Sequence, residues 1–252
     1  MAEEKKEEKK EVTETESAKA ESKASKKEVV IETIAAIFLG ITALLTAWAG
    51  WIGSLHGGNQ ATNYAKSNNL SAEANSEWNE ASQYMNQDMT LWNEYYKLKI
   101  QADFAEEAGD YDNADMYNYE KDVLLENNVS DEFYEAIEWA LAEEESTGYL
   151  VSPFDKEGYV DSYYEDARDL LAESDEILAQ GQRDNTCGDK FNLVVVIYSI
   201  VLFLLGIIGI FKSLPNRTIV LIGALICFVV ATAYMFTIPM PTGFSLSSFF
   251  GA

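Results

Sequence analysis

The sequence is poor in the side chains that most enzymes and metal sites use. Its 252 residues include one histidine and two cysteines, whereas nucleophilic catalysis and soft-metal sites usually draw on several such groups. Carboxylates are abundant, but no motif places a pair of them for acid–base chemistry. We therefore expect a protein that is not an enzyme and that uses no metal or other cofactor.

Basic residues are scarce as well. Lys and Arg number 18 against 42 Asp and Glu, which gives a formal net charge of −24. Binding to nucleic acid requires a basic face that neutralises phosphates, so the composition excludes nucleic acid as a partner. An acidic surface of this kind attracts cations, and we expect at most weak cation binding to it.

Three long apolar runs exclude a simple soluble globule. They cover residues 29–52, 192–211 and 218–240, and Glu32 is the only charged residue in them. A helix needs about 20 apolar residues to cross a bilayer, so each run predicts a transmembrane helix. Ala47-Trp48-Ala49 is similar to a signal-peptide cleavage site, but the first run is longer than the usual apolar region of such a peptide, and we interpret it as a span.

Basic residues beside the runs predict the orientation. Four lysines shortly precede the first run, and Lys212 and Arg217 lie in the short turn between the second and third runs. Both sites are expected in the cytoplasm, which places residues 53–190 outside it. The sequence therefore predicts a multi-pass protein of the plasma membrane with a cytoplasmic N-terminus and the lipid bilayer as its first partner.

The predicted segments follow one another in a simple order. They are a disordered cytoplasmic Glu/Lys tail (1–28), transmembrane helix 1 (29–52), an acidic helical extracytoplasmic domain (53–190), transmembrane helix 2 (191–211), a cytoplasmic turn (212–217), transmembrane helix 3 (218–240) and a short outer tail (241–252). The first segment is predicted to be disordered because it has no aromatic residue and cannot bury enough apolar area to offset the ordering of the chain. The extracytoplasmic segment holds 32 acids and 8 bases, so it accounts for the whole net charge.

Helical periodicity marks two expected packing faces. Apolar residues from Ala74 to Tyr96 recur at steps of three and four, and the members expected to form a packing interface are Trp78, Met85, Met89 and Trp92. Small residues on the third span form a second face, because small side chains let helices approach closely in lipid: Gly223, Cys227 and Ala231. The fold class predicted is all-α, with three transmembrane helices and an extracytoplasmic helical bundle or coiled coil.

Turn and cap signals divide the extracytoplasmic domain. We expect Gly109 to end a long helix, Ser130 to cap the start of another, and Ser152-Pro-Phe-Asp155 to form a capping box, with Gly158 delaying the helix that follows. That last helix is expected to end near Gly181. The helix–Gly–Asp–Tyr pattern is similar to a tetratricopeptide turn, but no 34-residue repeat accompanies it.

The remaining polar features give weaker predictions. The acidic stretch 109–115 departs from the EF-hand pattern at diagnostic positions, so we expect no specific calcium loop. Cys187 and Cys227 are not expected to pair, and His56 is interpreted as an interfacial residue. Asn69 and Asn128 both lie in glycosylation sequons, and their use stays open.

Several motifs follow one another in the C-terminal half: FYEAIEW at 133–139, Ser152-Pro153-Phe154, Tyr164 with Ala167 and Leu171, and GDKFNL at 188–193 leading into an apolar run. In these residues the chain resembles a family of uncharacterised prokaryotic three-span membrane proteins. The resemblance covers residues 130–240 and implies an N-terminal span, a helical extracytoplasmic segment and a C-terminal two-span hairpin. It implies no activity.

These observations favour a non-enzymatic integral membrane protein. We expect its acidic helical outer domain to mediate protein interaction or self-assembly, either as a homo-oligomer or with a membrane protein partner. Two alternatives stay open. The first is a sensor or signalling accessory subunit. The second is a channel or transport subunit that acts as an oligomer, although no ionisable group lies at mid-depth in the runs.

Overall fold

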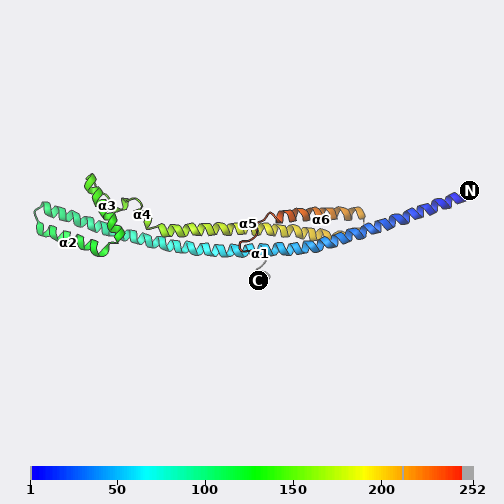
Figure 1. Ribbon diagram of the computed structural model, residues 1–252, viewed down its shortest axis with the longest axis horizontal. Helices are drawn as coiled ribbons and strands as arrows, with labels where there is room; N and C mark the ends of the chain where they lie inside the picture. The colour runs from blue at the N-terminus through cyan, green and yellow to red at the C-terminus, as the bar shows by residue number, and fades with distance from the viewer. Residues whose placement is uncertain (1, 212, 246–252) are drawn as a thin grey trace. The chain divides into compact units, whose positions relative to one another are not determined.

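The chain folds into helices joined by short turns. The structure is a computed structural model that describes residues 2–211 and 213–245, with side chains from residue 26 onward apart from those of 127 and 128. Every regular element in these ranges is a helix (Figure 1). In chain order they are α1 (Ala2–Glu107), α2 (Tyr111–Asn128), α3 (Asp131–Thr147), η1 (Pro153–Asp155), α4 (Tyr159–Ser162), α5 (Glu165–Ile207), η2 (Ile208–Ile210) and α6 (Leu214–Met235).

The chain divides into two compact units. Residues 1–64 with 179–252 form one, which we call the span unit, and residues 65–178 form the other, which we call the middle unit. Three helices are long and apolar enough to cross a membrane, and their apolar windows lie within Lys26–Glu107, Glu165–Ile210 and Leu214–Met235. The three spans predicted from the sequence are confirmed in their length and composition.

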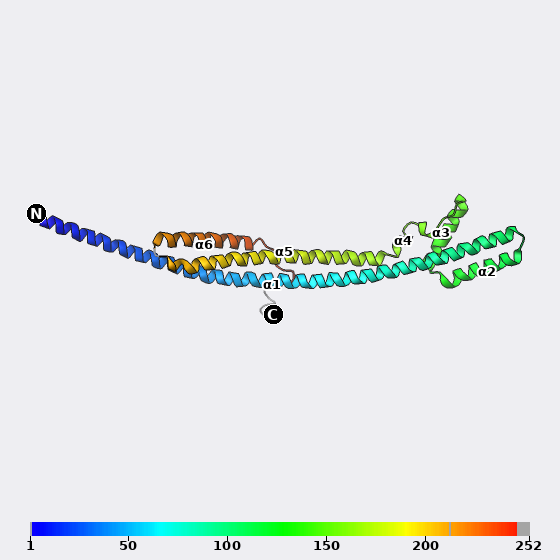
Figure 2. The ribbon, with the colours of Figure 1, turned by 180° about the vertical axis from the view of Figure 1, so that it is seen from behind.

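The span unit is built from α1, α5 and α6, which lie side by side in both opposite views (Figures 1 and 2). One buried cluster joins Ile52 of α1 to Tyr198 of α5 and Ala231 of α6. A second joins Ala35, Val201 and Ala224 from the same three helices. At the end of the unit that holds the α5–α6 turn, the Arg217 guanidinium lies 2.8 Å from the Glu32 carboxylate, so the single acid of the first run has a cationic partner.

Glycines let α1 and α5 approach closely in the span unit. A Cβ atom added to Gly181 would lie 2.7 Å from the Tyr64 ring, and one added to Gly53 would lie 3.2 Å from Phe191 Cβ. The prediction that a helix ends near Gly181 is wrong, because α5 continues without a break to Ile207. Gly181 is a packing position that only the smallest residue fits.

The first helix is also longer than its sequence signals indicate. It passes through Gly57 and Gly58, and it begins at Ala2, within the segment predicted to be disordered. Glu and Lys at i,i+4 spacing can support a helix in such a polar segment. Contacts of the side chains before residue 26 lie outside those described, so disorder of the free tail stays a prediction.

The middle unit has its own aromatic core. Phe133, Ala136, Ile137 and Ala140 present one buried face of α3 to Trp92 of α1, and neighbouring residues of α2 and α4 close the cluster. The Phe133 ring stacks on the Tyr159 ring with centroids 6.0 Å apart. Local caps set the helix ends as predicted.

These caps follow the expected chemistry. The Ser130 side chain accepts the Phe133 amide, and Ser152 and Asp155 form the capping box of η1. Gly109 and Gly158 take positive φ values of 77° and 81°, which a residue with a side chain rarely adopts. The predicted breaks at these positions are confirmed.

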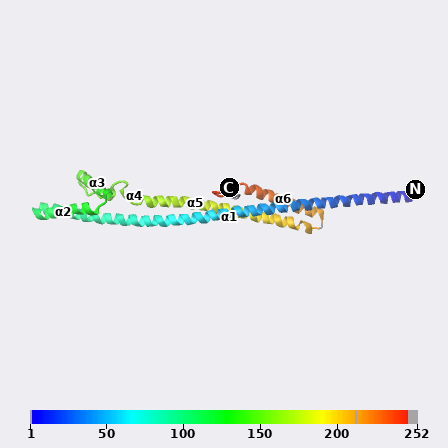
Figure 3. The ribbon, with the colours of Figure 1, turned by 60° about the horizontal axis from the view of Figure 1, so that its bottom comes forward.

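In the middle unit α5 runs antiparallel to α1 (Figures 1 and 3). Small residues line this contact: Ala74 and Ala167 are buried, and the Ser174 hydroxyl lies 2.9 Å from the Ser67 hydroxyl and 2.8 Å from that of Ser71. Such residues allow the two helices to pack at short distance while their polar groups stay satisfied.

Two tyrosines near the start of α5 have raised pKa values, and we therefore expect the middle unit to lose stability at alkaline pH. Burial, with the adjacent Asp88 carboxylate, raises the pKa of Tyr159 and of Tyr163 above the usual value for tyrosine. Tyr159 Oη lies 3.2 Å from Asp88 Oδ2 and 2.5 Å from Tyr163 Oη, and Tyr163 also bonds to Asp88. Folding therefore favours the neutral phenols, so their contribution is present below about pH 10 and is lost as the pH rises above that value.

The measurement is a series of thermal melts of the full chain between pH 7 and 12. Wild type should lose stability more steeply above pH 10 than the Tyr159→Phe/Tyr163→Phe variant. Equal slopes for the two proteins would contradict the expectation.

Candidate functional site

The single histidine is buried between α1 and α5 in the span unit. Only 2% of His56 is exposed, and its ring stacks on Phe191 with centroids 5.8 Å apart. His56 Nδ1 lies 2.8 Å from Asp184 Oδ1, and Nε2 lies 3.1 Å from the Pro239 carbonyl oxygen. Both ring nitrogens therefore face oxygen acceptors. A ring protonated on both nitrogens would donate to both of these acceptors.

Asp184 is the counter-ion and is equally buried. Its Oδ1 accepts from His56, while its Oδ2 accepts from the side-chain amides of Asn63 and Gln180, each at 3.3 Å. A buried carboxylate is costly unless it is paired and hydrogen-bonded, and these three donors meet both requirements. The result is a buried ion pair without net charge.

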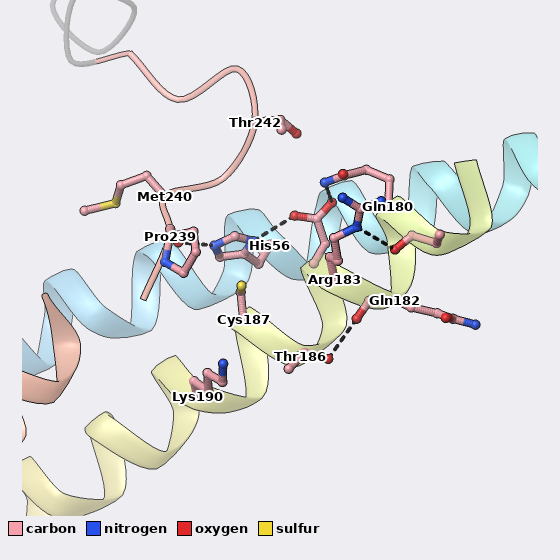
Figure 4. A pocket seen from close by; sticks show the side chains of 12 residues that line it. His56, Gln180, Gln182, Arg183, Thr186, Cys187, Lys190, Pro239, Met240 and Thr242 are labelled. Carbon is pink, nitrogen blue, oxygen red and sulfur yellow. Dashed lines mark hydrogen bonds and ion pairs between the residues drawn. The ribbon is translucent and has the colours of Figure 1, made fainter. Parts of the chain in front are cut away.

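This ion pair forms one wall of a pocket of about 640 Å³ (Figure 4). The lining residues come from α1, from the α5 segment 179–190 and from the chain after α6. They are His56, Ala179, Gln180, Gln182, Arg183, Asp184, Thr186, Cys187, Lys190, Pro239, Met240 and Thr242. All of them belong to the span unit. The pocket thus combines apolar side chains with a few polar and cationic groups, as ligand sites commonly do.

The chain after α6 is held against α1 beside the pocket. His56 binds the Pro239 carbonyl, and one helical turn later the Asn59 amide lies 3.2 Å from both the carbonyl and the hydroxyl oxygen of Thr242. Near these contacts, the Phe244 ring lies edge-on to Trp48 and Trp51, with centroids 6.1 and 5.8 Å apart. Pro239, Met240 and Thr242 of this segment line the pocket.

The predicted packing stripe on α1 makes contacts within its own chain. Trp92 is buried in the aromatic core, and the Trp78 ring lies 4.4 Å from the Tyr164 ring. Met85 Sδ lies 3.7 Å from the Tyr164 hydroxyl, whereas Met89 is 44% exposed. Three of the four side chains thus contact residues of the same chain.

The small-residue face on α6 is buried at one end and open at the other. Ala231 is fully buried between the three helices, and Cys227 packs at the edge of the second cluster. No atom lies within 4 Å of a Cβ added to Gly223, which leaves that end of the face open. Cys187 and Cys227 are both free thiols, in agreement with the expectation that they do not pair.

The acidic residues do not converge on a metal site in the part of the chain described. Within residues 2–211 and 213–245, no three His, Cys, Asp or Glu side chains are grouped to hold an ion. Asn69 is exposed on α1, while the side chain of Asn128 lies outside those described.

The sequence did not show that His56 is buried against Asp184, because this partner lies 128 positions away in the chain. The interpretation of His56 as an interfacial residue stays a prediction. No local motif joins the two residues. The signal available in the sequence was the position of His56, which lies one helical turn beyond an apolar run that is predicted to span the membrane.

Comparison with protein-family models finds no match for this chain, and comparison with curated proteins and with solved structures finds none either. The resemblance to uncharacterised three-span membrane proteins therefore stays a prediction. The function has to be argued from the residues themselves.

Proposed function

We propose that the protein is a non-enzymatic integral membrane protein of the plasma membrane, and that its acidic helical outer domain binds a basic protein partner. Three helices of sufficient length and apolarity support the membrane assignment. The lysines before the first run and Arg217 in the hairpin turn support a cytoplasmic N-terminus and turn. The middle unit then lies outside the cytoplasm as a helical bundle.

The observation that carries this proposal lies at the α1–α2 hairpin of the middle unit. Residues 100–120, which we call the tip, contain seven acids and no Lys or Arg. Large aromatic side chains stand exposed among them: Phe104 is 69% exposed, Tyr111 65% and Tyr119 70%. Exposed aromatics commonly anchor protein interfaces, and the surrounding carboxylates favour a cationic partner that can also stack on the rings.

The charge of the middle unit argues against self-assembly through this surface. Residues 65–178 hold 30 acids and 6 bases. Two copies brought together there would repel each other, because like charges facing across an interface cost several kcal/mol. If copies associate, the open Gly223 face of α6 is the better surface, since it lies within an uncharged span. The sensor and transport alternatives have no comparable feature to support them.

The test is native mass spectrometry of the full chain isolated from its own host in mild detergent. We expect a co-purifying basic subunit that is released as salt is raised, because screening weakens attraction between exposed charges. The variant Phe104→Ser/Tyr111→Ser/Tyr119→Ser should bind this subunit at least about tenfold more weakly, since exposed aromatic anchors contribute more than 1 kcal/mol each at such interfaces.

Tyr149 and Leu150 provide the matched control. They are 78% and 61% exposed in the loop after α3, and the variant Tyr149→Ser/Leu150→Ser removes similar apolar surface away from the tip. It should retain the subunit. A chain that is monomeric without a partner, or a partner that the tip variant still holds at wild-type strength, would overturn the proposal.

A further inference from the structure

The pocket beside His56 differs in charge from the acidic domain around it. Of the 8 bases in residues 53–190, only Arg183 and Lys190 lie outside the middle unit, and both line the pocket. The same segment 179–190 contains two acids. Asp184 is already paired with His56, and Asp189 does not line the pocket. The pocket therefore carries two uncompensated positive charges.

Neither cation is used by the fold in the described part of the chain. Arg183 donates only to the Ala179 carbonyl of its own helix, at 3.4 Å, and neither Arg183 nor Lys190 forms an ion pair among the residues with described side chains. They lie seven residues apart on α5, so they share one helix face at about two turns' separation. Two free cations on one face of a pocket can approach the same anion from both sides.

The rest of the wall suits a ligand that is partly apolar. Ala179, Pro239 and Met240 contribute apolar surface, and Cys187 adds a half-buried thiol. The His56–Asp184 pair beneath them has no net charge and its hydrogen-bonding groups are occupied. A free anion would contact only the two cations, whereas an anion attached to an apolar group would also contact the apolar side chains of the wall.

The position of the pocket along the spans matches the headgroup level of a bilayer. Lys190 directly precedes the apolar segment that starts at Phe191, and Trp48 and Trp51 lie within two turns of His56 on α1. Aromatic residues of this kind gather where the apolar core meets the headgroups, and long cationic side chains reach the same depth. A lipid phosphate would therefore lie within reach of Arg183 and Lys190.

We propose that this pocket binds the phosphate of an anionic phospholipid, with Arg183 and Lys190 as its two cationic contacts and with the wall of Ala179, Pro239 and Met240 against the glycerol and upper acyl chain. The shared chemistry is a phosphate anion, and a free phosphate is the other source that could supply it. The site lies in the span unit and does not depend on the interaction proposed for the tip.

The experiment measures lipid binding to the full chain, purified and delipidated in mild detergent, by native mass spectrometry. The probes are phosphatidylglycerol and phosphatidylcholine with identical acyl chains, and inorganic phosphate as competitor. Both lipids carry the phosphate, but only phosphatidylcholine carries a choline cation that opposes the two bases. Wild type should therefore bind phosphatidylglycerol about tenfold more tightly than phosphatidylcholine. The variant Arg183→Gln/Lys190→Gln should lose this preference.

A matched variant separates the site from general charge. Lys97→Gln/Lys156→Gln removes two bases from the middle unit and should keep the wild-type preference. Competition by millimolar inorganic phosphate would support the same two contacts with a soluble source, and its absence would support the lipid. Wild type that binds both lipids equally and does not respond to phosphate would overturn the proposal. So would a preference that survives Arg183→Gln/Lys190→Gln.

Discussion

Replacing Asp184 with alanine should destabilise the span unit by about 3–5 kcal/mol, the usual cost of leaving one partner of a buried ion pair without the other. The His56 ring would remain 2% exposed, with the Pro239 carbonyl as its one remaining acceptor. The side-chain amides of Asn63 and Gln180 would lose their acceptor at the same time. We expect the loss as a lower midpoint in thermal unfolding of the full chain in detergent.

A double variant distinguishes the ion pair from simple loss of volume. His56→Leu/Asp184→Leu removes both charges together, and replacing a buried pair by apolar side chains is often close to neutral. Its stability should lie nearer to wild type than that of Asp184→Ala. Asp189→Ala is the matched control, since Asp189 is an exposed acid on the same helix and should change stability by less than about 0.5 kcal/mol.

A small effect of Asp184→Ala would contradict the charge state inferred for His56. A destabilisation below about 1 kcal/mol is what a neutral imidazole with a weak hydrogen bond would give. The double variant would then be less stable than Asp184→Ala, because it would also remove the stacked His56 ring from Phe191.

Local signals in the sequence predicted the local structure well. The ends of α3 and η1 follow from Ser130, Ser152 and Asp155, because a cap is a contact between residues two or three positions apart. Gly109 and Gly158 were identifiable for the same reason, since a positive φ value is a property of one residue. The three spans needed only composition and length.

Long-range contacts account for what the sequence could not show. Gly181 carries the usual signal of a helix end, yet its role is to admit the ring of Tyr64 from another helix. The same ambiguity applies to Gly57 and Gly58, through which α1 continues. The stripe of α1 illustrates a further limit. Periodicity predicted a packing face, but it could not name the residues that meet it: Phe133 lies 41 positions beyond Trp92, and Tyr164 lies 86 positions beyond Trp78.

The pocket beside His56 shows this limit most directly. In the sequence its cations count only among the 8 bases of residues 53–190, and its acid only among the 32 acids. The pocket exists because α1, α5 and the chain after α6 meet, and His56 on α1 lies 128 positions from Asp184 and 183 positions from Pro239. Only the folded structure shows that Asp184 pairs with His56, whereas Arg183 and Lys190 form no ion pair among the described side chains.

The second large effect is expected from Phe133→Ala in the core of the middle unit. Phe133 is fully buried against Phe154 and Tyr159, with ring centroids 5.7 and 6.0 Å away. Truncating a buried phenylalanine usually costs about 3–5 kcal/mol, through lost apolar burial and the cavity left behind. The middle unit has the length of an ordinary domain, so a loss of this size is a large part of the total stability that such a domain has.

Hydrogen exchange of the full chain in detergent or nanodiscs locates the effect. Peptides from α2, α3 and α4 should exchange faster in Phe133→Ala, while peptides from the three spans keep their wild-type protection, because the middle unit has a core of its own. Tyr134→Ala is the control, since the neighbouring side chain is 40% exposed on another face of α3 and should change little. Faster exchange spread equally over the spans would mean that the two units unfold as one, and the acidic domain would then not be an independently folded module able to present its tip to a partner.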